Sequence, residues 1–219
     1  MAEHGFIPQM LSKSRFNRRV HAIADLMDDL FAQMGMALKD ISDNTEYLID
    51  SFPVPICHNI RISRCRLVNS SEYRGYIASK RCYFYGVRVH LLSTANGIPV
   101  EVAFLPGSAH DIRGLHTLPV NLPPGSQVYA DKAFNDYLIE DNLAFCDEIS
   151  LQVQRKKNSK RTDPPWVEFI KQTTRHYIET VFSLITQKFP KSIHAVTMKG
   201  FLLKLRAFIF AFTLEQAFL

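Results

Sequence analysis

The chain has 219 residues, a formal net charge of +5 and an isoelectric point near 9.0. Its length and its 47% hydrophobic content suffice to bury the core of one good-sized domain, which excludes a disordered protein. The four cysteines form no CxxC pair and no regular spacing, so we expect free thiols in a reducing cytoplasm rather than a zinc ribbon or a disulfide framework. There is no signal-peptide layout and no uninterrupted apolar span, and we expect neither export nor a membrane helix.

An amphipathic helix is predicted from about residue 14 to residue 38, because apolar side chains recur there at spacings of three and four. Arg15, Arg18 and Arg19 lie in its first turns, where positive charge opposes the helix dipole. Contact with phosphate and simple solvation explain these three arginines equally well.

The clearest local pattern is a period-two alternation on both sides of Asn96-Gly97. It predicts antiparallel strands over 83–92 and 98–105, joined by a type I′ turn, because Asn and Gly accept the positive φ values of that turn. A hairpin cannot bury its apolar face alone, so the run 47–49, which ends at Asp50, is the expected third strand. Pro53 and Pro55 are expected to end its pairing.

The remaining pattern alternates helices and strands. It predicts strands at 126–131 and 149–153, a short helix ending near 118, and helices at 135–144, at 166–188 and from 199 onward. Asp111 is expected to cap the short helix, and His90 is expected to be buried with its hydrogen bonds satisfied.

Three acids fall at the ends or edges of these elements. Asp50 and Asp131 each end a predicted strand, and Glu179 borders the apolar stripe of the long helix, four residues after Arg175. Carboxylates that converge repel one another, and magnesium relieves such repulsion; two ions about 3.5–4 Å apart can drive phosphodiester displacement. From spacing alone, however, the aspartates are equally turn formers or caps, and Arg175 and Glu179 an ordinary i,i+4 pair.

Cations gather in two segments of the chain. The first segment contains Arg61, Arg64 and Arg66 with Arg74, Lys80 and Arg81, and the second contains Arg155, Lys156, Lys157, Lys160 and Arg161. Such clusters suit a polyanion, most commonly nucleic acid, and the alternative is a solvated surface loop.

Seven segments in a fixed order resemble bacterial insertion-sequence transposases of the DDE class. They are LIDSFP (48–53), GYIASK (75–80), FYGVRVHL (84–91), PGS (106–108), YADKAF (129–134), RKKNSK (155–160) and IET (178–180), and the resemblance runs from about Met10 to the end of the chain. It implies an α/β fold with a ribonuclease-H-like mixed sheet flanked by helices, in which Asp50, Asp131 and Glu179 hold two magnesium or manganese ions. It also implies double-stranded DNA as substrate, a homo-oligomer on that DNA, and a cytoplasmic, nucleoid-associated protein. Lys132 and Arg175 then join the two basic segments as expected DNA contacts.

The resemblance divides the chain into 1–45, a helical remnant of a DNA-binding region, and 46–219, the catalytic domain. Two departures stand out: transposases of this class usually carry a longer helical region before the position of Met10, and Gln172 and Thr186 replace a tyrosine and a lysine. Lys188 is a possible substitute for that lysine. The function implied is cleavage and strand transfer at element ends. The alternatives are a shortened copy that binds DNA without catalysis and a related nuclease.

Overall fold

The computed structural model describes residues 10–42, 44–57, 59–78, 80–190 and 193–218, without the side chains of residues 59–61. The described helices are α1 (Lys13–Ala22), α2 (Ala24–Ile41), α3 (Asp111–Thr117), α4 (Tyr137–Cys146), α5 (Pro165–Gln187) and α6 (Met198–Phe218). The strands are β1 (Glu46–Cys57), β2 (Arg74–Ile77), β3 (Cys82–Thr94), β4 (Pro99–Pro106), β5 (Gln127–Ala130) and β6 (Ser150–Val153). Short 3-10 turns occupy η1 (Asn59–Arg64), η2 (Ser71–Tyr73) and η3 (Lys132–Phe134).

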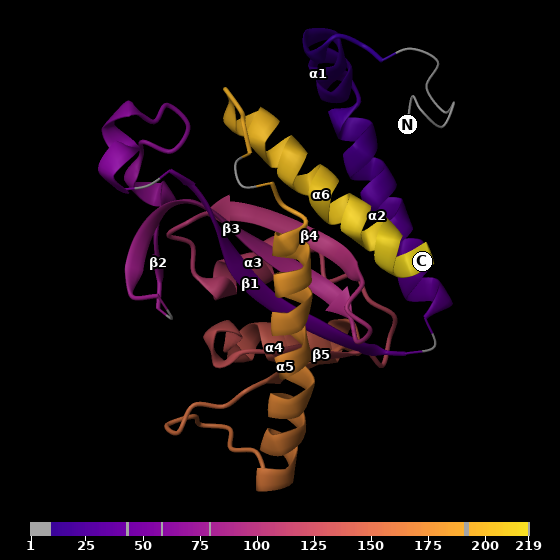
Figure 1. Ribbon diagram of the computed structural model, residues 1–219. Coiled ribbons are helices and arrows are strands. Elements are labelled where there is room, and N and C mark those ends of the chain that lie inside the picture. Colours follow the sequence, from indigo (N-terminus) through magenta and orange to yellow (C-terminus); the bar gives the residue numbers. More distant parts are fainter. Residues whose placement is uncertain (1–9, 43, 58, 79, 191–192, 219) are drawn as a thin grey trace.

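The strands form one mixed sheet in the order β2-β3-β1-β5-β6, with β4 also paired to β3 (Figure 1). The predicted hairpin is β3 and β4, and β1 pairs antiparallel with β3 as its expected third strand. β1, β5 and β6 are mutually parallel neighbours. Together with the helices on both faces, this is the ribonuclease-H-like α/β arrangement that the resemblance implies.

The hairpin turn differs from the predicted type I′. Gly97 has a φ of 81°, whereas Asn96 does not have a positive φ, and a type I′ turn needs positive φ at both central residues. The Gly97 amide donates to the Thr94 carbonyl and the Thr94 amide to the Ile98 carbonyl. These bonds match a three-residue loop that ends in a left-handed glycine.

The prediction that the two prolines end pairing was wrong. β1 continues to Cys57, with Pro53 opposite Arg88 and Pro55 opposite Gly86. The neighbouring β5 pairs with β1 over Glu46–Ile49, so β5 does not need the amides that the prolines lack. Beyond Ile49 the strand has a free edge, where proline is tolerated.

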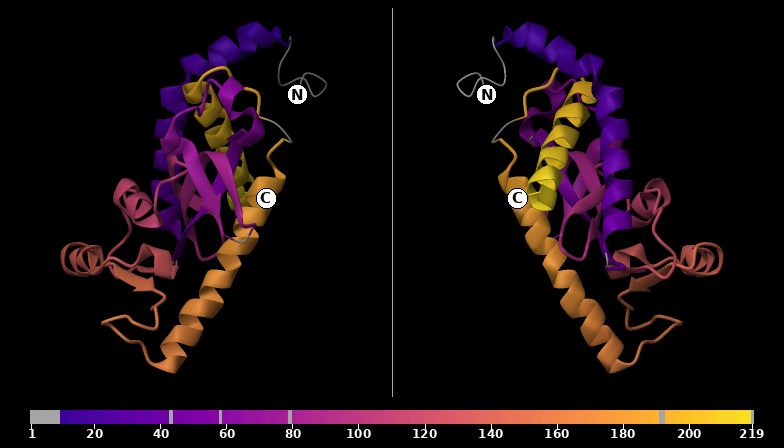
Figure 2. Two further views of the ribbon diagram at one scale, coloured as in Figure 1. Left: turned by 90° about the vertical axis from the view of Figure 1, so that its left-hand side faces the viewer. Right: turned by 90° about the vertical axis from the view of Figure 1, so that its right-hand side faces the viewer.

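Helices cover both faces of the sheet (Figures 1 and 2). α2, α5 and α6 pack over one face, on a core that includes Leu48, Leu91, Ile178 and Leu205. α3 and α4 cover the other face, where Ile49 and Val128 are buried. No helix in the described part of the chain is long and apolar enough to cross a membrane.

The predicted N-terminal helix is two helices, which meet at Ile23 with φ −102° and ψ 13°. Phe31 and Gly35 face the core from α2, and Gly35 lies so close to the Val100 carbonyl that no side chain would fit. Phe16, Ile23 and Leu30 of the predicted apolar stripe are largely exposed instead. The period of the apolar residues therefore predicted the helix but not its buried face.

Candidate active site

Asp50 lies in the middle of β1, on the same face as the buried Leu48 and Phe52. Its side chain is 13% exposed. Burial raises the pKa of Asp50 to about 6, although the Ser51 amide and the Arg175 guanidinium lower it; Asp131 and Asp111 raise it further. Ionising this carboxylate therefore carries a desolvation cost, and a nearby cation is needed to offset it.

Asp131 is carried to the same place by the parallel pairing of β5 with β1. Ile49 lies opposite Ala130, so the residues that follow them, Asp50 and Asp131, are neighbours across the two strands. Asp131 does not end a strand but caps η3, where its carboxylate accepts a 2.7 Å bond from the Lys132 amide. Its other oxygen, Oδ2, faces the guanidinium of Arg175.

Glu179 comes to these aspartates from α5. That helix buries Ile178, Val181 and Phe182 against the sheet, and Glu179 lies at the border of this buried stripe with a 60% exposed side chain. The long helix crosses in front of the sheet in Figure 1, and its N-terminal half extends beyond it. Glu179 therefore reaches the site from the solvent side.

One nitrogen connects the three acids. Arg175 Nη2 lies 3.4 Å from Asp50 Oδ2, 3.6 Å from Asp131 Oδ2 and 3.8 Å from Glu179 Oε1. The structure thus gathers the three predicted acids around the guanidinium of Arg175, for which the sequence predicted a DNA contact. Two of these partners, Asp50 and Asp131, lie far away in the sequence, whereas Glu179 lies four residues along the same helix.

The donor set suits a hard divalent cation, since magnesium prefers carboxylate oxygens. As the side chains lie, no group of three or more His, Cys, Asp or Glu among the described residues is arranged to hold a metal ion. The Arg175 guanidinium lies between the three acids, with its Nη2 within 3.8 Å of one oxygen of each. The residues fit such an ion in type, provided that the guanidinium moves.

A second polar group lies on the opposite face of the sheet, and the sequence did not predict it. Arg88 Nη1 donates to Ser51 Oγ at 3.2 Å, and the Ser51 hydroxyl donates to Asp111. Asp111 begins α3 and pairs with Arg88 at 3.6 Å instead of capping the helix, so the predicted cap was wrong. The alternation of β1 could have revealed this group, because Ser51 must face away from Asp50.

His90 lies beside this group and is buried as predicted, but its hydrogen bonds are not satisfied. Neither ring nitrogen has a hydrogen-bond partner among the described residues. Burial lowers the pKa of His90 to about 4, although Asp111 raises it, and Arg88 lowers it further. The ring is therefore neutral near pH 7.

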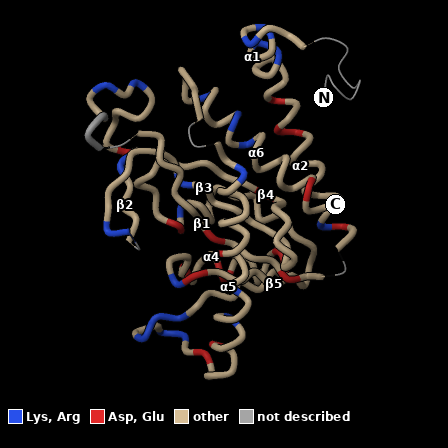
Figure 3. The backbone as a smooth tube through the Cα atoms, in the orientation of Figure 1, with Lys and Arg blue, Asp and Glu red and all other residues tan. Residues whose placement is uncertain are grey.

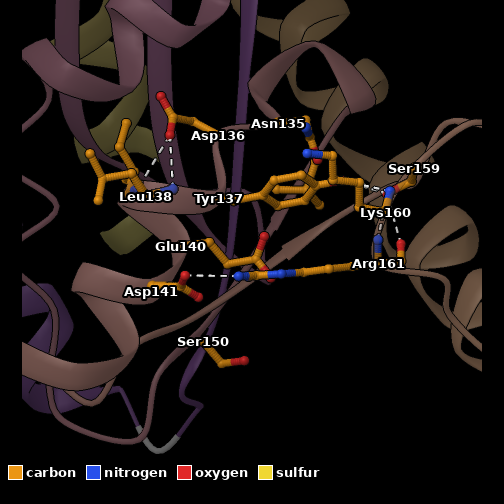
Figure 4. A network of polar contacts seen from close by, with 12 residues as sticks. Asn135, Asp136, Tyr137, Leu138, Glu140, Asp141, Ser150, Ser159, Lys160 and Arg161 are labelled. Atoms are coloured by element: carbon orange, nitrogen blue, oxygen red, sulfur yellow. Dashed lines mark hydrogen bonds and ion pairs between the residues drawn. The ribbon is translucent and has the colours of Figure 1, made fainter.

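The cations of the second basic segment gather on the loop that follows β6 (Figure 3), where some are paired with acids and others are exposed. Arg155 is 6% exposed, donates to both Glu140 oxygens at 2.6 and 2.9 Å, and lies 3.8 Å from Asp163, so it is a structural residue here and not a free phosphate contact. Arg161 pairs with Asp141 at 2.8 Å and lies over the Tyr137 ring (Figure 4). The exposed cations of this segment include Lys156, Lys157 and Lys160.

The other predicted DNA contacts are exposed arginines, and a lysine that shares a cavity with Arg175. Arg64 and Arg66 are exposed, and the side chain of Arg61 lies outside the described residues. Lys132 lines a cavity of about 290 Å³ with Gln154, Arg155, Glu168, Gln172, Arg175 and His176. Lys188 pairs with Glu215 at 2.7 Å, an interaction on the surface between α5 and α6. Gln172, one of the two departures from the signature, thus borders the acidic site.

Comparison with known proteins identifies the fold's family. A model of the transposase DDE domain matches residues 39–194, which is more than half of the chain and includes Asp50, Asp131 and Glu179. Neither the curated proteins nor the solved structures contain a significant match. The chain therefore belongs to the family of transposases with a DDE domain.

Proposed function

We propose that this chain cleaves DNA strands at the ends of an insertion element and joins the freed 3′-hydroxyl to target DNA. The observation that supports this most strongly is the convergence of three carboxylates on one cationic nitrogen, at positions inside the matched family domain. Acids gathered around one positive charge are what a divalent-metal phosphodiester site requires.

Asp50 and Asp131 would hold the metal ions between them, and Glu179 would complete the second site. Magnesium or manganese, when bound, would activate water or a 3′-hydroxyl and stabilise the leaving oxygen. The protein's own part is to fix Asp50 within β1 and Asp131 directly after the adjacent β5. Glu179, on a helix and mostly exposed, can adjust to the ions.

Double-stranded DNA is the substrate that we propose. The exposed Lys156, Lys157 and Lys160 would contact phosphates along one side of the site, together with Lys132, Arg64 and Arg66. We further propose that a homo-oligomer assembles on the DNA, and that 1–45 is a helical DNA-binding segment attached to a catalytic domain of 46–219.

A second candidate is a DNA-binding copy without catalysis, which the two signature departures favour. Gln172 replaces a tyrosine at the cavity wall, and the Thr186 hydroxyl bonds to the carbonyls of Phe182 and Ser183 within its own helix. Neither residue supplies the group that the family signature places there.

Strand cleavage tests the proposal. The substrate is labelled DNA carrying the sequences that flank the gene, incubated with the chain and magnesium. D50N, D131N and E179Q should each lower the cleavage rate by roughly a thousandfold, since losing a metal ligand removes several kcal/mol of transition-state stabilisation. D147N, at the exposed end of α4, is the matched control and should cleave normally. Binding without cleavage by the unaltered chain would instead support the second candidate.

A further inference from the structure

Arg175 occupies the position at which the proposed function requires a divalent cation. We infer that Arg175 is an exchangeable internal cation: it neutralises Asp50, Asp131 and Glu179 when no metal is bound, and competes with divalent ions for the same oxygens. This inference rests on the proposed function. It adds that metal enters only as the guanidinium leaves.

The acids need such a cation when metal is absent. Asp50 and Asp131 are mostly buried, and each directly follows one residue of the Ile49–Ala130 pair that joins β1 to β5. Like charges held this closely disfavour ionisation, and a positive charge among them reverses that effect. Arg175 supplies this charge from α5, one turn before Glu179.

Its contacts are looser than those of a permanent ion pair. Arg175 Nη2 lies 3.4–3.8 Å from the three carboxylate oxygens, whereas Arg155 donates to Glu140 at 2.6 and 2.9 Å with both terminal nitrogens. Short bidentate contacts are the strong ones. Arg175 shares one nitrogen among three acids and gives none of them a short bond, so it can leave at modest cost.

The structure also provides a place for the displaced side chain. Arg175 lines the cavity of about 290 Å³ that contains Gln154, Gln172 and the carboxylate of Glu168. Its Nε has no hydrogen-bond partner among the described residues. The cavity therefore offers polar side chains that would receive the guanidinium when it leaves the three acids.

Competition and simple positioning predict opposite results. If Arg175 competes with metal, removing its charge tightens metal binding, because the acids lose their resident cation. If Arg175 only holds the acids in place, removing it loosens them and weakens metal binding. The sign of the change in metal affinity therefore decides between the two roles.

The experiment measures Mn²⁺ binding to the full chain without DNA, by electron paramagnetic resonance or calorimetry. R175Q should bind Mn²⁺ roughly 5–150-fold more tightly than the unaltered chain, the range typical of coupled equilibria. R175K keeps the charge and should stay closer to the unaltered chain. R161Q is the matched control, because Arg161 pairs with Glu140 and Asp141 and should leave Mn²⁺ affinity unchanged.

Thermal unfolding gives a second readout that does not depend on activity. In EDTA, R175Q should melt below the unaltered chain, and Mn²⁺ should raise its Tm by more than it raises that of the unaltered chain. Equal or weaker Mn²⁺ binding by R175Q, or by the equally uncharged R175M if R175Q does not fold, would overturn the inference. Mn²⁺ binding that D50N leaves unchanged would instead remove the proposed metal site itself.

Discussion

His90 is a fully buried titratable residue on the sheet face opposite Asp50. Glycine is required at position 114 of α3, because a Cβ there would lie 2.0 Å from His90 Nδ1. The charged groups that face the ring are Asp111 of α3, at 4.0 Å, and Arg88 of β3. The fold thus holds a neutral imidazole in a tight site.

The burial of His90 should make the protein sensitive to acid. The folded pKa is about 4 and the ordinary value 6.5, so between these pH values the unfolded chain takes up a proton that the folded chain does not. Stability should therefore fall as pH drops from 7 to 4, by about 3 kcal/mol from this residue. Urea unfolding at both pH values should show a smaller loss for H90N, and equal losses would contradict this role of the buried ring.

Motif order predicted which acids lie near one another, but it did not predict how the surrounding charges pair. Asp50, Asp131 and Glu179 were identified from motif order, and the structure gathers them. Arg155 and Arg175 were predicted to contact DNA because they lie near other cations or the motif. Most of their carboxylate partners, such as Glu140 for Arg155 and Asp50 for Arg175, lie on other elements, and a run of charges does not reveal which charges the fold neutralises.

At the scale of elements, a buried ion pair fastens α2 to the sheet. Lys39 Nζ lies 2.5 Å from Glu101 Oε1 of β4 and donates to the Asn121 carbonyl at 2.8 Å. Glu101 also accepts from the amides of Val120 and Asn121. Both charges of this buried pair therefore have hydrogen-bonding partners. Removing one of them would leave the other buried without its counter-ion, which is strongly destabilising.

K39M should therefore lower the free energy of unfolding by about 3–5 kcal/mol, because Glu101 would remain buried without its cation. K188M is the matched control, since Lys188 and Glu215 form an exposed pair that contributes about 0–1 kcal/mol. Chemical denaturation of both variants provides the comparison. Similar losses of unfolding free energy in K39M and K188M would show that the burial of an ion pair does not set the cost of removing its lysine.

Elements were predictable in type and approximate position, but less so in their junctions. Alternation predicted β3 and β4, because side chains on a half-buried sheet must alternate. The turn between them depends on the backbone of Asn96, which composition does not fix. The break at Ile23 and the exposed Leu30 depend on how α2 packs on β4 and α6, which no local pattern encodes.

At the scale of the whole molecule, positive charge is not spread evenly (Figure 3). The segment after β6 carries exposed lysines, while its arginines are bound to α4 by carboxylates and by the Tyr137 ring. The arginines thus pair within the fold, and the exposed lysines are the cations that we propose to contact DNA phosphates.

Replacing Lys156, Lys157 and Lys160 with glutamine should weaken DNA binding for all sequences alike. The slope of log affinity against log salt should fall by about 0.9 for each phosphate that the protein no longer neutralises. R155Q should lower the stability of the fold and have little effect on the salt slope. K199Q, at the start of α6, should have little effect on either the stability or the salt slope. Fluorescence anisotropy across a salt series measures these slopes. An unchanged slope in the triple variant would assign the lysines to ordinary surface.

The proposed function and the role of Arg175 both depend on where a divalent ion binds. Crystals of the protein grown with Mn²⁺ would locate the ion by its anomalous scattering. We predict manganese bound by carboxylate oxygens of Asp50 and Asp131, with Glu179 turned toward it and Arg175 turned away. Manganese at other residues, or Arg175 still among the three acids at saturating Mn²⁺, would contradict this prediction.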